Sequence, residues 1–159
     1  MEIEFDVKIS ANVLYDYMLR HTYSSLSGIM GTLVGALMLV LFASNRQPIC
    51  LIIGVVILLY LPWTLFIKSR QQALGTPAFK KPLHYRLSDE GIEVSQDETV
   101  EQMEWDGMVK AVSTINSIIV YTTPTNACIF PKKDLGDSKY KVIEIISTHM
   151  PPKKVKIRG

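Results

Sequence analysis

The sequence predicts a membrane protein of the α+β class, with a transmembrane hairpin of two helices and a small antiparallel β-sheet or partial barrel capped by a C-terminal helix. Two observations lead to this prediction. The chain contains two long uncharged runs separated by a short connection, and strand-like segments then precede one amphipathic segment. Strands followed by a helix favour an α+β arrangement over a parallel α/β one.

The composition agrees with this class. The 159 residues include 17 Lys and Arg against 15 Asp and Glu, so the formal net charge is only +2. Charged residues make up 20% of the chain, below the usual ~25%, and the mean hydropathy is +0.19. These values disfavour a disordered chain and a fully soluble globule. Two cysteines, Cys50 and Cys128, are too few for a disulfide framework or a zinc site.

Residues 1–25 are expected to form a strand and an amphipathic helix. Apolar and charged residues alternate over residues 2–9, which is the period of a half-buried strand. A lone strand is unstable, so we expect this one to pair with the C-terminal sheet. Ser10 or Asn12 can cap the helix that follows, whose apolar side begins at Leu14.

Residues 26–67 are expected to form the transmembrane hairpin. The uncharged runs are residues 26–43 and 49–67, of 18 and 19 residues, and a bilayer core of ~30 Å needs about 20 helical residues. Apolar runs without alternation fit helices rather than barrel strands. Because the connection, residues 44–48, is too short to hold a domain, both outer ends of the hairpin must lie on the same side.

The charges that flank the runs orient the hairpin. Residues 68–82 contain four basic residues and no acid, whereas the connection contains only Arg46. Basic residues accumulate on the cytoplasmic side, so both termini are expected in the cytoplasm. We interpret residues 68–82 as a basic juxtamembrane linker, which either only sets the topology or also binds a specific anionic lipid.

Small residues in the two runs predict close packing of the helices, because small side chains let helix backbones approach each other. Packing within the hairpin is favoured over homodimerisation or docking on another membrane protein. Neither run contains an ionisable residue, which a transport or proton pathway would normally need. The candidate packing residues are Gly28, Gly31, Gly35, Cys50 and Gly54.

Residues 83–152 are expected to form a cytoplasmic domain. Short strand segments with turn signals between them occupy its first part, and a hairpin turn with a left-handed glycine is expected at residues 106–107. Asp137 or Ser138 can cap a helix that continues to about His149.

Residues 153–159 form a basic tail. A solvated tail is favoured over one that contacts lipid headgroups or an acidic partner. Together with the basic linker, the tail supplies the candidate residues for contact with lipid or a partner. These residues are Lys68, Arg70, Lys80, Lys81, Lys153, Lys154, Lys156 and Arg158.

Five short segments carry a resemblance to a known family. They are residues 87–92, 104–105, 109–110, 118–121 and 129–133. With the N-terminal strand and the hairpin, they resemble the YcxB-like proteins of Gram-positive bacteria. The resemblance implies a bacterial cell membrane protein whose cytoplasmic part is similar to a pleckstrin-homology-like (PH-like) domain, a bent antiparallel sheet capped by a C-terminal helix. The shared motifs are structural, so no catalytic residue is carried over.

No pattern in the chain points to catalysis. His21, His84 and His149 have no partner at metal-ligand spacing, and no glycine-rich phosphate loop occurs. The six acids within residues 93–106 are interpreted as a solvated strand edge rather than a cation site. We therefore expect no enzyme activity, catalytic residue, metal, cofactor or small-molecule substrate.

The expected function is that of a non-catalytic, membrane-anchored binding module or accessory subunit. Its cytoplasmic domain would recognise a protein partner or anionic lipid. The expected partners are the bilayer and a membrane protein or a second copy, and nucleic acid is not among them. Two alternatives are an immunity or self-protection protein against a membrane-acting toxin or peptide, and a lipid-modifying or transport-associated enzyme.

Overall fold

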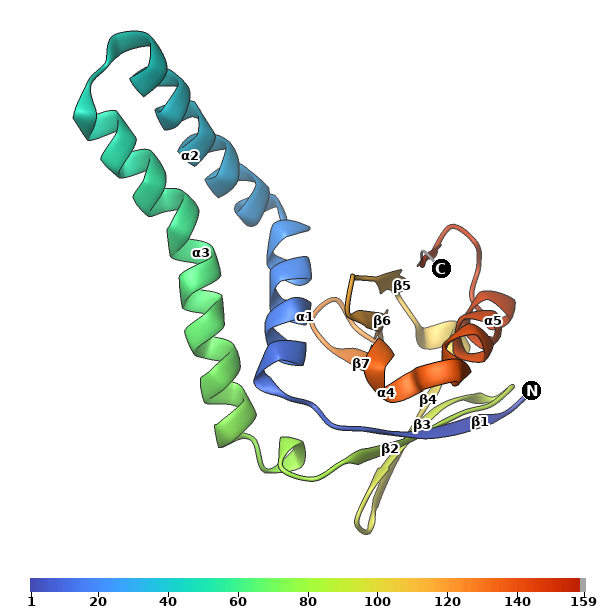
Figure 1. Ribbon diagram of the computed structural model, residues 1–159. Helices are drawn as coiled ribbons and strands as arrows, with labels where there is room; N and C mark the ends of the chain where they lie inside the picture. The colour runs from blue at the N-terminus through green and yellow to red at the C-terminus, as the bar shows by residue number, and fades with distance from the viewer. Residues whose placement is uncertain (158–159) are drawn as a thin grey trace.

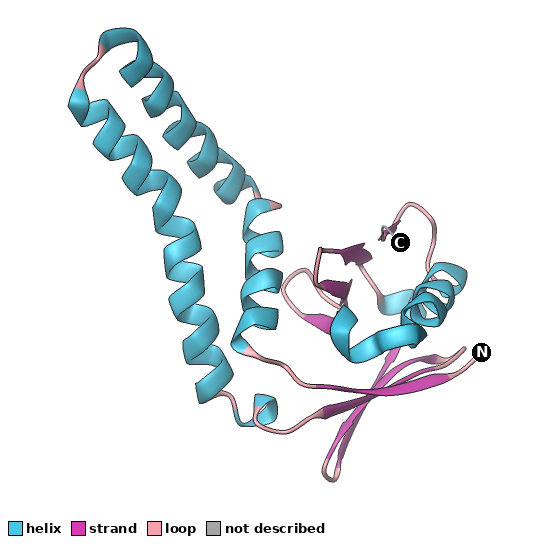
Figure 2. Cartoon of the chain, viewed as in Figure 1, coloured by secondary structure: helices cyan, strands magenta, loops and turns pink. Residues whose placement is uncertain are grey.

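The computed structural model describes residues 1–157, and it places a long helical arm beside a body that contains two sheets (Figure 1). Helices make up the whole arm, whereas the strands lie in the body (Figure 2). The elements are β1 (Ile3–Val7), α1 (Ala11–Tyr23), α2 (Leu26–Asn45), α3 (Pro48–Gly75), β2 (Leu83–Leu87), β3 (Gly91–Gln96), β4 (Thr99–Glu104), β5 (Lys110–Ser113), β6 (Ser117–Tyr121), β7 (Ala127–Pro131), α4 (Lys132–Leu135), α5 (Lys139–His149) and β8 (Val155–Lys156).

The strands of the described residues form two four-stranded sheets. The first has the order β1-β2-β3-β4 and is antiparallel throughout. The second has the order β7-β6-β5-β8, in which β8 alone pairs in parallel, with β5. The expected antiparallel sheet is therefore divided in two, because the chain changes sheets between β4 and β5.

The prediction of a hairpin turn at residues 106–107 is wrong. Trp105–Gly107 form a 3-10 turn that connects strands of different sheets. The indole Nε1 of buried Trp105 donates to the Ser88 carbonyl oxygen at 2.9 Å and draws this segment onto the body. Gly107 lacks a positive φ, and the left-handed residue is instead Asp97, with φ of 53°, in the turn between β3 and β4.

The N-terminal strand pairs with the rest of the first sheet, as the alternation over residues 2–9 predicts. Ile3 lies opposite Leu87 and Phe5 lies opposite Tyr85 in the antiparallel ladder of β1 and β2. The arm therefore leaves the body from one strand and returns to it at the neighbouring strand.

The core of the body lies between the two sheets and α5. The rings of Phe5, Tyr85 and Phe130 meet there, with centroids 5.0 to 6.0 Å apart. α5 contributes Val142 and Ile146, which are fully buried on the apolar side that its sequence period predicts. Full burial of a large apolar side chain contributes about 1.5–3 kcal/mol, so this cluster holds the sheets and α5 together.

The helices of the arm begin where capping residues allow. Ser10 caps α1, and its Oγ accepts a hydrogen bond from Val13 N at 3.4 Å. Ser25 caps α2 in the same way, and Pro48 occupies the first turn of α3. α3 continues to Gly75, so the first half of the predicted linker is helical.

The prediction of a solvated tail is partly wrong. β8 pairs with β5, and Ala111 N donates to the Lys154 carbonyl oxygen at 2.9 Å. The local sequence did not indicate this strand, because its partner lies more than 40 residues away in the chain. Arg158 lies outside the described residues.

Candidate interaction surfaces

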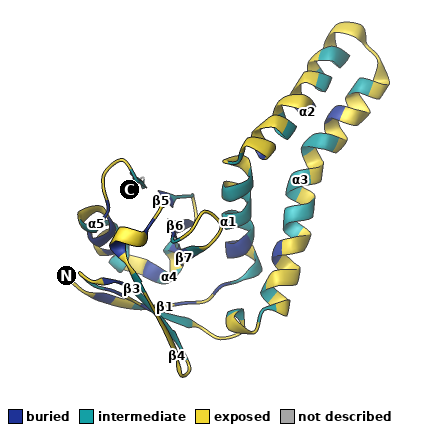
Figure 3. Ribbon diagram, turned by 180° about the vertical axis from the view of Figure 1, so that it is seen from behind, coloured by how far each residue is buried: buried dark blue, intermediate teal, exposed yellow. Residues whose placement is uncertain are grey.

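The outer surfaces of α2 and α3 are apolar and exposed. Both helices are long and apolar enough to cross a membrane by length and composition. In their most apolar windows only 11% and 6% of the positions are buried inside the structure. Most of the arm is accordingly exposed in Figure 3. The most exposed apolar residues include Leu26, Leu33, Val40, Leu59, Tyr60 and Trp63.

Two of the candidate packing glycines lie where α2 and α3 are closest. A Cβ atom added to Gly35 would lie 2.7 Å from Leu58 Cγ. One added to Gly54 would lie 2.9 Å from Leu39 Cδ2 and 3.1 Å from the Gly35 carbonyl oxygen. The absence of side chains at these two positions therefore lets the helices approach each other.

The other three candidate packing residues have different surroundings. A Cβ atom added to Gly31 would lie 3.9 Å from Leu61, which is an ordinary contact distance. Gly28 packs against the end of α1 rather than α3, because its added Cβ would overlap the Thr22 carbonyl oxygen. Cys50 is half-buried in the first turn of α3.

α1 joins the arm to the second sheet. The Tyr17 hydroxyl donates to the Thr125 carbonyl oxygen at 2.8 Å, and the Thr114 hydroxyl donates to Asp16 Oδ2 at 2.5 Å. The ring of Tyr17 lies 6.0 Å from that of Tyr121 on β6. Burial raises the pKa of Tyr121 to about 12 and also raises the pKa of Tyr17. Both phenols therefore stay protonated at neutral pH, and the Tyr17 hydroxyl can donate its hydrogen bond to Thr125.

A second joint ties the connection after α3 to the hairpin of β3 and β4. Gln96 Nε2 donates to the carbonyl oxygens of Ala78 and Lys81 at 2.8 and 3.2 Å. Lys81 Nζ donates to both carboxylate oxygens of Asp97, at 2.9 and 2.7 Å. Lys81, a candidate lipid contact, is therefore engaged within the fold. The sequence did not identify Gln96, since no local pattern marks a side chain that caps distant carbonyls.

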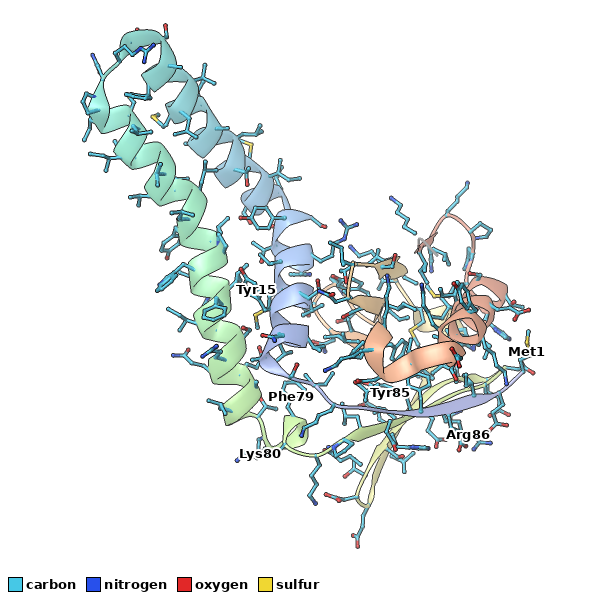
Figure 4. All side chains as sticks on the ribbon, in the orientation of Figure 1. Met1, Tyr15, Phe79, Lys80, Tyr85 and Arg86 are labelled. Atoms are coloured by element: carbon cyan, nitrogen blue, oxygen red, sulfur yellow. The ribbon has the colours of Figure 1, made fainter. Side chains whose placement is uncertain are left out.

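The remaining basic residues of the linker lie in two places: two are on α3, and one is in the connection that follows it. Lys68 and Arg70 are exposed on α3, and the Arg70 guanidinium lies 4.6 Å from the ring centroid of Phe66. Lys80 follows the end of α3 and lies level with the first sheet (Figure 4). The structure thus separates candidates that the sequence groups together.

The tail candidates are separated as well. Lys154 Nζ donates to the Met108 carbonyl oxygen at 2.9 Å and is used within the fold. Lys156 lies in β8, and Lys153 is exposed in the turn before it.

The outer face of the first sheet is acidic. Glu2, Glu4 and Asp6 alternate with the buried residues of β1. Arg86 Nε contacts the Glu2 carboxylate and lies 3.6 Å from Glu4, and His84 Nδ1 lies 2.8 Å from Asp6 Oδ1. No group of three His, Cys, Asp or Glu side chains that could hold a metal ion occurs within residues 1–157.

β4 forms an open end of the first sheet. Among residues 1–157, no strand pairs with its outer edge. Five of its six residues are exposed, including Val100, Glu101 and Glu104. Of the six acids that the sequence placed on a strand edge, five lie on β4 or in the turns at its two ends, whereas Glu93 is half-buried on β3.

The turn between β2 and β3 contacts α5 through Asp89 and His149. His149 Nε2 lies 3.2 Å from Asp89 Oδ1, and the His149 ring stacks on Trp105 with centroids 5.3 Å apart. The amino group of Met1 donates to the same carboxylate at 2.7 Å. This hydrogen bond, with a further contribution from His149, lowers the pKa of Asp89.

One comparison with known proteins matches the body. A family model described as YcxB-like protein matches residues 87–141, which confirms the resemblance that the sequence suggested. The match extends from the end of β2 into the start of α5, so it lies outside the helical arm. No curated protein and no solved structure matches the chain.

Proposed function

We propose that the protein is a membrane-anchored binding module, in which α2 and α3 cross the bilayer as a hairpin and the two-sheet body recognises a protein partner. The exposed apolar surface of α2 and α3 is the observation that carries the proposal. Soluble proteins rarely expose apolar patches of more than a few hundred Å². Hydrocarbon is the environment that suits the apolar parts of two such helices.

The charges at the ends of the helices support a cytoplasmic body. Arg46 is the one basic residue between α2 and α3, whereas Lys68 and Arg70 follow the apolar part of α3. This asymmetry supports a topology with both termini on the cytoplasmic side of a bacterial cell membrane.

The order of the strands supports the PH-like arrangement that the resemblance implies. Four antiparallel strands form the first sheet, β5 to β7 form antiparallel pairs in the second, and α5 follows them. A binding role agrees with this fold, and the ligand has to be inferred from the surface of the body.

The acidic edge of β4 favours a protein partner over anionic lipid as the ligand of the body. Carboxylates at Glu98, Glu101 and Glu104 would repel an anionic surface. An extended peptide that carries Lys or Arg could instead pair with the open edge of β4, since strand addition uses unpaired backbone groups. β4 also lies at the end of the molecule opposite the turn between α2 and α3 (Figure 1).

Affinity purification of the full-length protein from native membranes in mild detergent tests this proposal. We expect the wild type to retain a stoichiometric protein partner, and we expect Glu101→Lys with Glu104→Lys to lower its recovery roughly tenfold, because like charges then face each other. The double variant Asp137→Lys with Glu144→Lys makes the same charge change at two exposed positions, before and on α5, and should leave recovery unchanged. Bare wild-type monomer, or equal recovery with the β4 variant, would contradict the proposal.

A further inference from the structure

A groove of about 650 Å³ lies along one side of α3 and is bordered by Tyr15 of α1. Its walls are apolar and aromatic, and they include Val55, Leu59, Trp63 and Phe66 of α3 and Tyr15 of α1. The rings of Tyr15 and Phe66 meet edge to face, with centroids 5.7 Å apart. α3 therefore supplies most of the groove, and α1 borders it where Tyr15 meets Phe66.

One cation lies in line with this groove. Leu59, Trp63, Phe66 and Arg70 share one face of α3, because a helix turns about 100° per residue. The Arg70 guanidinium covers the Phe66 ring at 4.6 Å from its centroid. Lys68 is the other nearby cation on α3, and it lies about 200° around the helix from Arg70.

We propose that this groove binds one anionic phospholipid, with an acyl chain along Leu59 and Trp63 and the phosphate on Arg70. The inference rests on the proposed membrane anchoring and adds a specific lipid to it. A guanidinium is planar and offers several donors, which suits phosphate oxygens. Arg70 follows Phe66 by about 6 Å along the helix axis, where a headgroup would follow the chain.

The length of the groove favours a lipid over another transmembrane helix. The α3 wall from Val55 to Phe66 spans about 16 Å. That length matches one leaflet, half of a hydrocarbon core of ~30 Å. A partner helix would cross both leaflets, whereas one acyl chain occupies one of them.

Trp63 allows the occupant to be identified in the full-length protein. It is 67% exposed and lies in the groove, whereas Trp105 is buried in the body and supplies a constant emission. We would reconstitute the protein in phosphatidylcholine vesicles that contain either brominated phosphatidylglycerol or brominated phosphatidylcholine, since bromine quenches tryptophan on contact. We expect the brominated phosphatidylglycerol to quench Trp63 at a several-fold lower mole fraction.

Two charge variants separate a site on Arg70 from general attraction to a charged surface. Arg70→Ala should abolish the preference for the anionic lipid, whereas Lys68→Ala removes the same charge from another side of α3 and should preserve it. Trp63→Phe should remove the quenchable emission. Equal quenching by both lipids in the wild type, or equal loss of preference in the two charge variants, would overturn the inference.

A lack of quenching by either lipid would also overturn it, because a second copy or a partner helix would then cover the groove. Flotation of each variant with the vesicles reports membrane anchoring separately. Protein that does not float contradicts the anchoring itself. Protein that floats without lipid preference contradicts only the lipid site.

Discussion

Burial determines the chemistry of the Cys128 thiol on β7. Its Sγ lies 3.9 Å from Met103 Sδ in the interior of the body. Loss of solvation raises the pKa of Cys128 to about 12, so the thiol stays protonated at neutral pH. The thiolate is the reactive form of cysteine, and this residue should therefore be inert in the folded protein.

Alkylation of a Cys50→Ser variant measures this protection. We expect iodoacetamide to leave Cys128 unmodified in the folded protein at about pH 8 and to modify it in guanidinium chloride. Mass spectrometry of the peptide that contains Cys128 gives the extent of modification. Rapid modification of the folded protein would contradict the observed burial.

Asp89 makes the contact between the β2–β3 turn and α5 dependent on pH. Its pKa is lowered by the hydrogen bond from the Met1 amino group and by His149. A carboxylate whose pKa is lowered by folding stabilises the fold at pH values above its pKa in the unfolded chain, which is ~3.9. This stabilisation is lost as the pH falls through the folded pKa.

We therefore expect Asp89→Asn to lower the Tm at neutral pH. At pH values below the pKa of Asp89 in the folded protein, the variant and the wild type should have the same Tm. Thermal unfolding in detergent, followed by circular dichroism, gives the difference at each pH. Asp137→Asn, at an exposed acid before α5, serves as the control. A deficit that persists unchanged in acid would show that the charge is not its cause.

At the scale of elements, the crossing of α2 and α3 depends on backbone approach at Gly54. An added methyl group at Gly54 would meet both Leu39 and the Gly35 carbonyl oxygen. We expect Gly54→Ala to destabilise the helix pair by about 1–3 kcal/mol, as overpacking typically does. Denaturation in detergent mixtures, followed by circular dichroism, measures the change.

Gly31→Ala is the matched control, since the added atom has room beside Leu61. Alanine also favours the helix by up to ~1 kcal/mol over glycine, so this variant should be as stable as the wild type or more stable. Equal destabilisation by the two substitutions would contradict the packing described here.

The elements that depend on neighbouring residues could be predicted from the sequence. The alternation over residues 2–9 and the Ser10 cap predict β1 and α1. The uncharged runs predict the two long helices. The division into two sheets could not be predicted, because the turn at Trp105 depends on a hydrogen bond to Ser88 across the body.

The same distinction applies to the candidate contact residues. The spacing of small residues four positions apart predicted Gly35 as a packing position, because this spacing is visible within one short stretch of the sequence. Lys81 and Lys154 were grouped with exposed cations, yet their partners, Asp97 and the Met108 carbonyl, lie far away in the sequence. The groove needs Tyr15 of α1 beside α3, which no sequence pattern indicates.

At the scale of the whole molecule, the arm and the body are joined in two ways. The chain enters and leaves the arm through neighbouring strands, β1 and β2. Tyr17 ties α1 to the second sheet, and Gln96 ties the connection after α3 to the first. These contacts hold the body beside one end of the arm, so the proposed hairpin would keep the body at one face of the bilayer (Figure 1).

Cysteine accessibility in intact cells tests the proposed anchoring directly. In a background that carries Cys50→Ser and Cys128→Ala, Arg46→Cys places a thiol between α2 and α3, and Lys153→Cys places one on the body. We expect a membrane-impermeant maleimide to label the first position in intact cells and the second only after the cells are permeabilised. Equal labelling of both positions in intact cells, or recovery of the protein in the soluble fraction, would contradict the proposed hairpin.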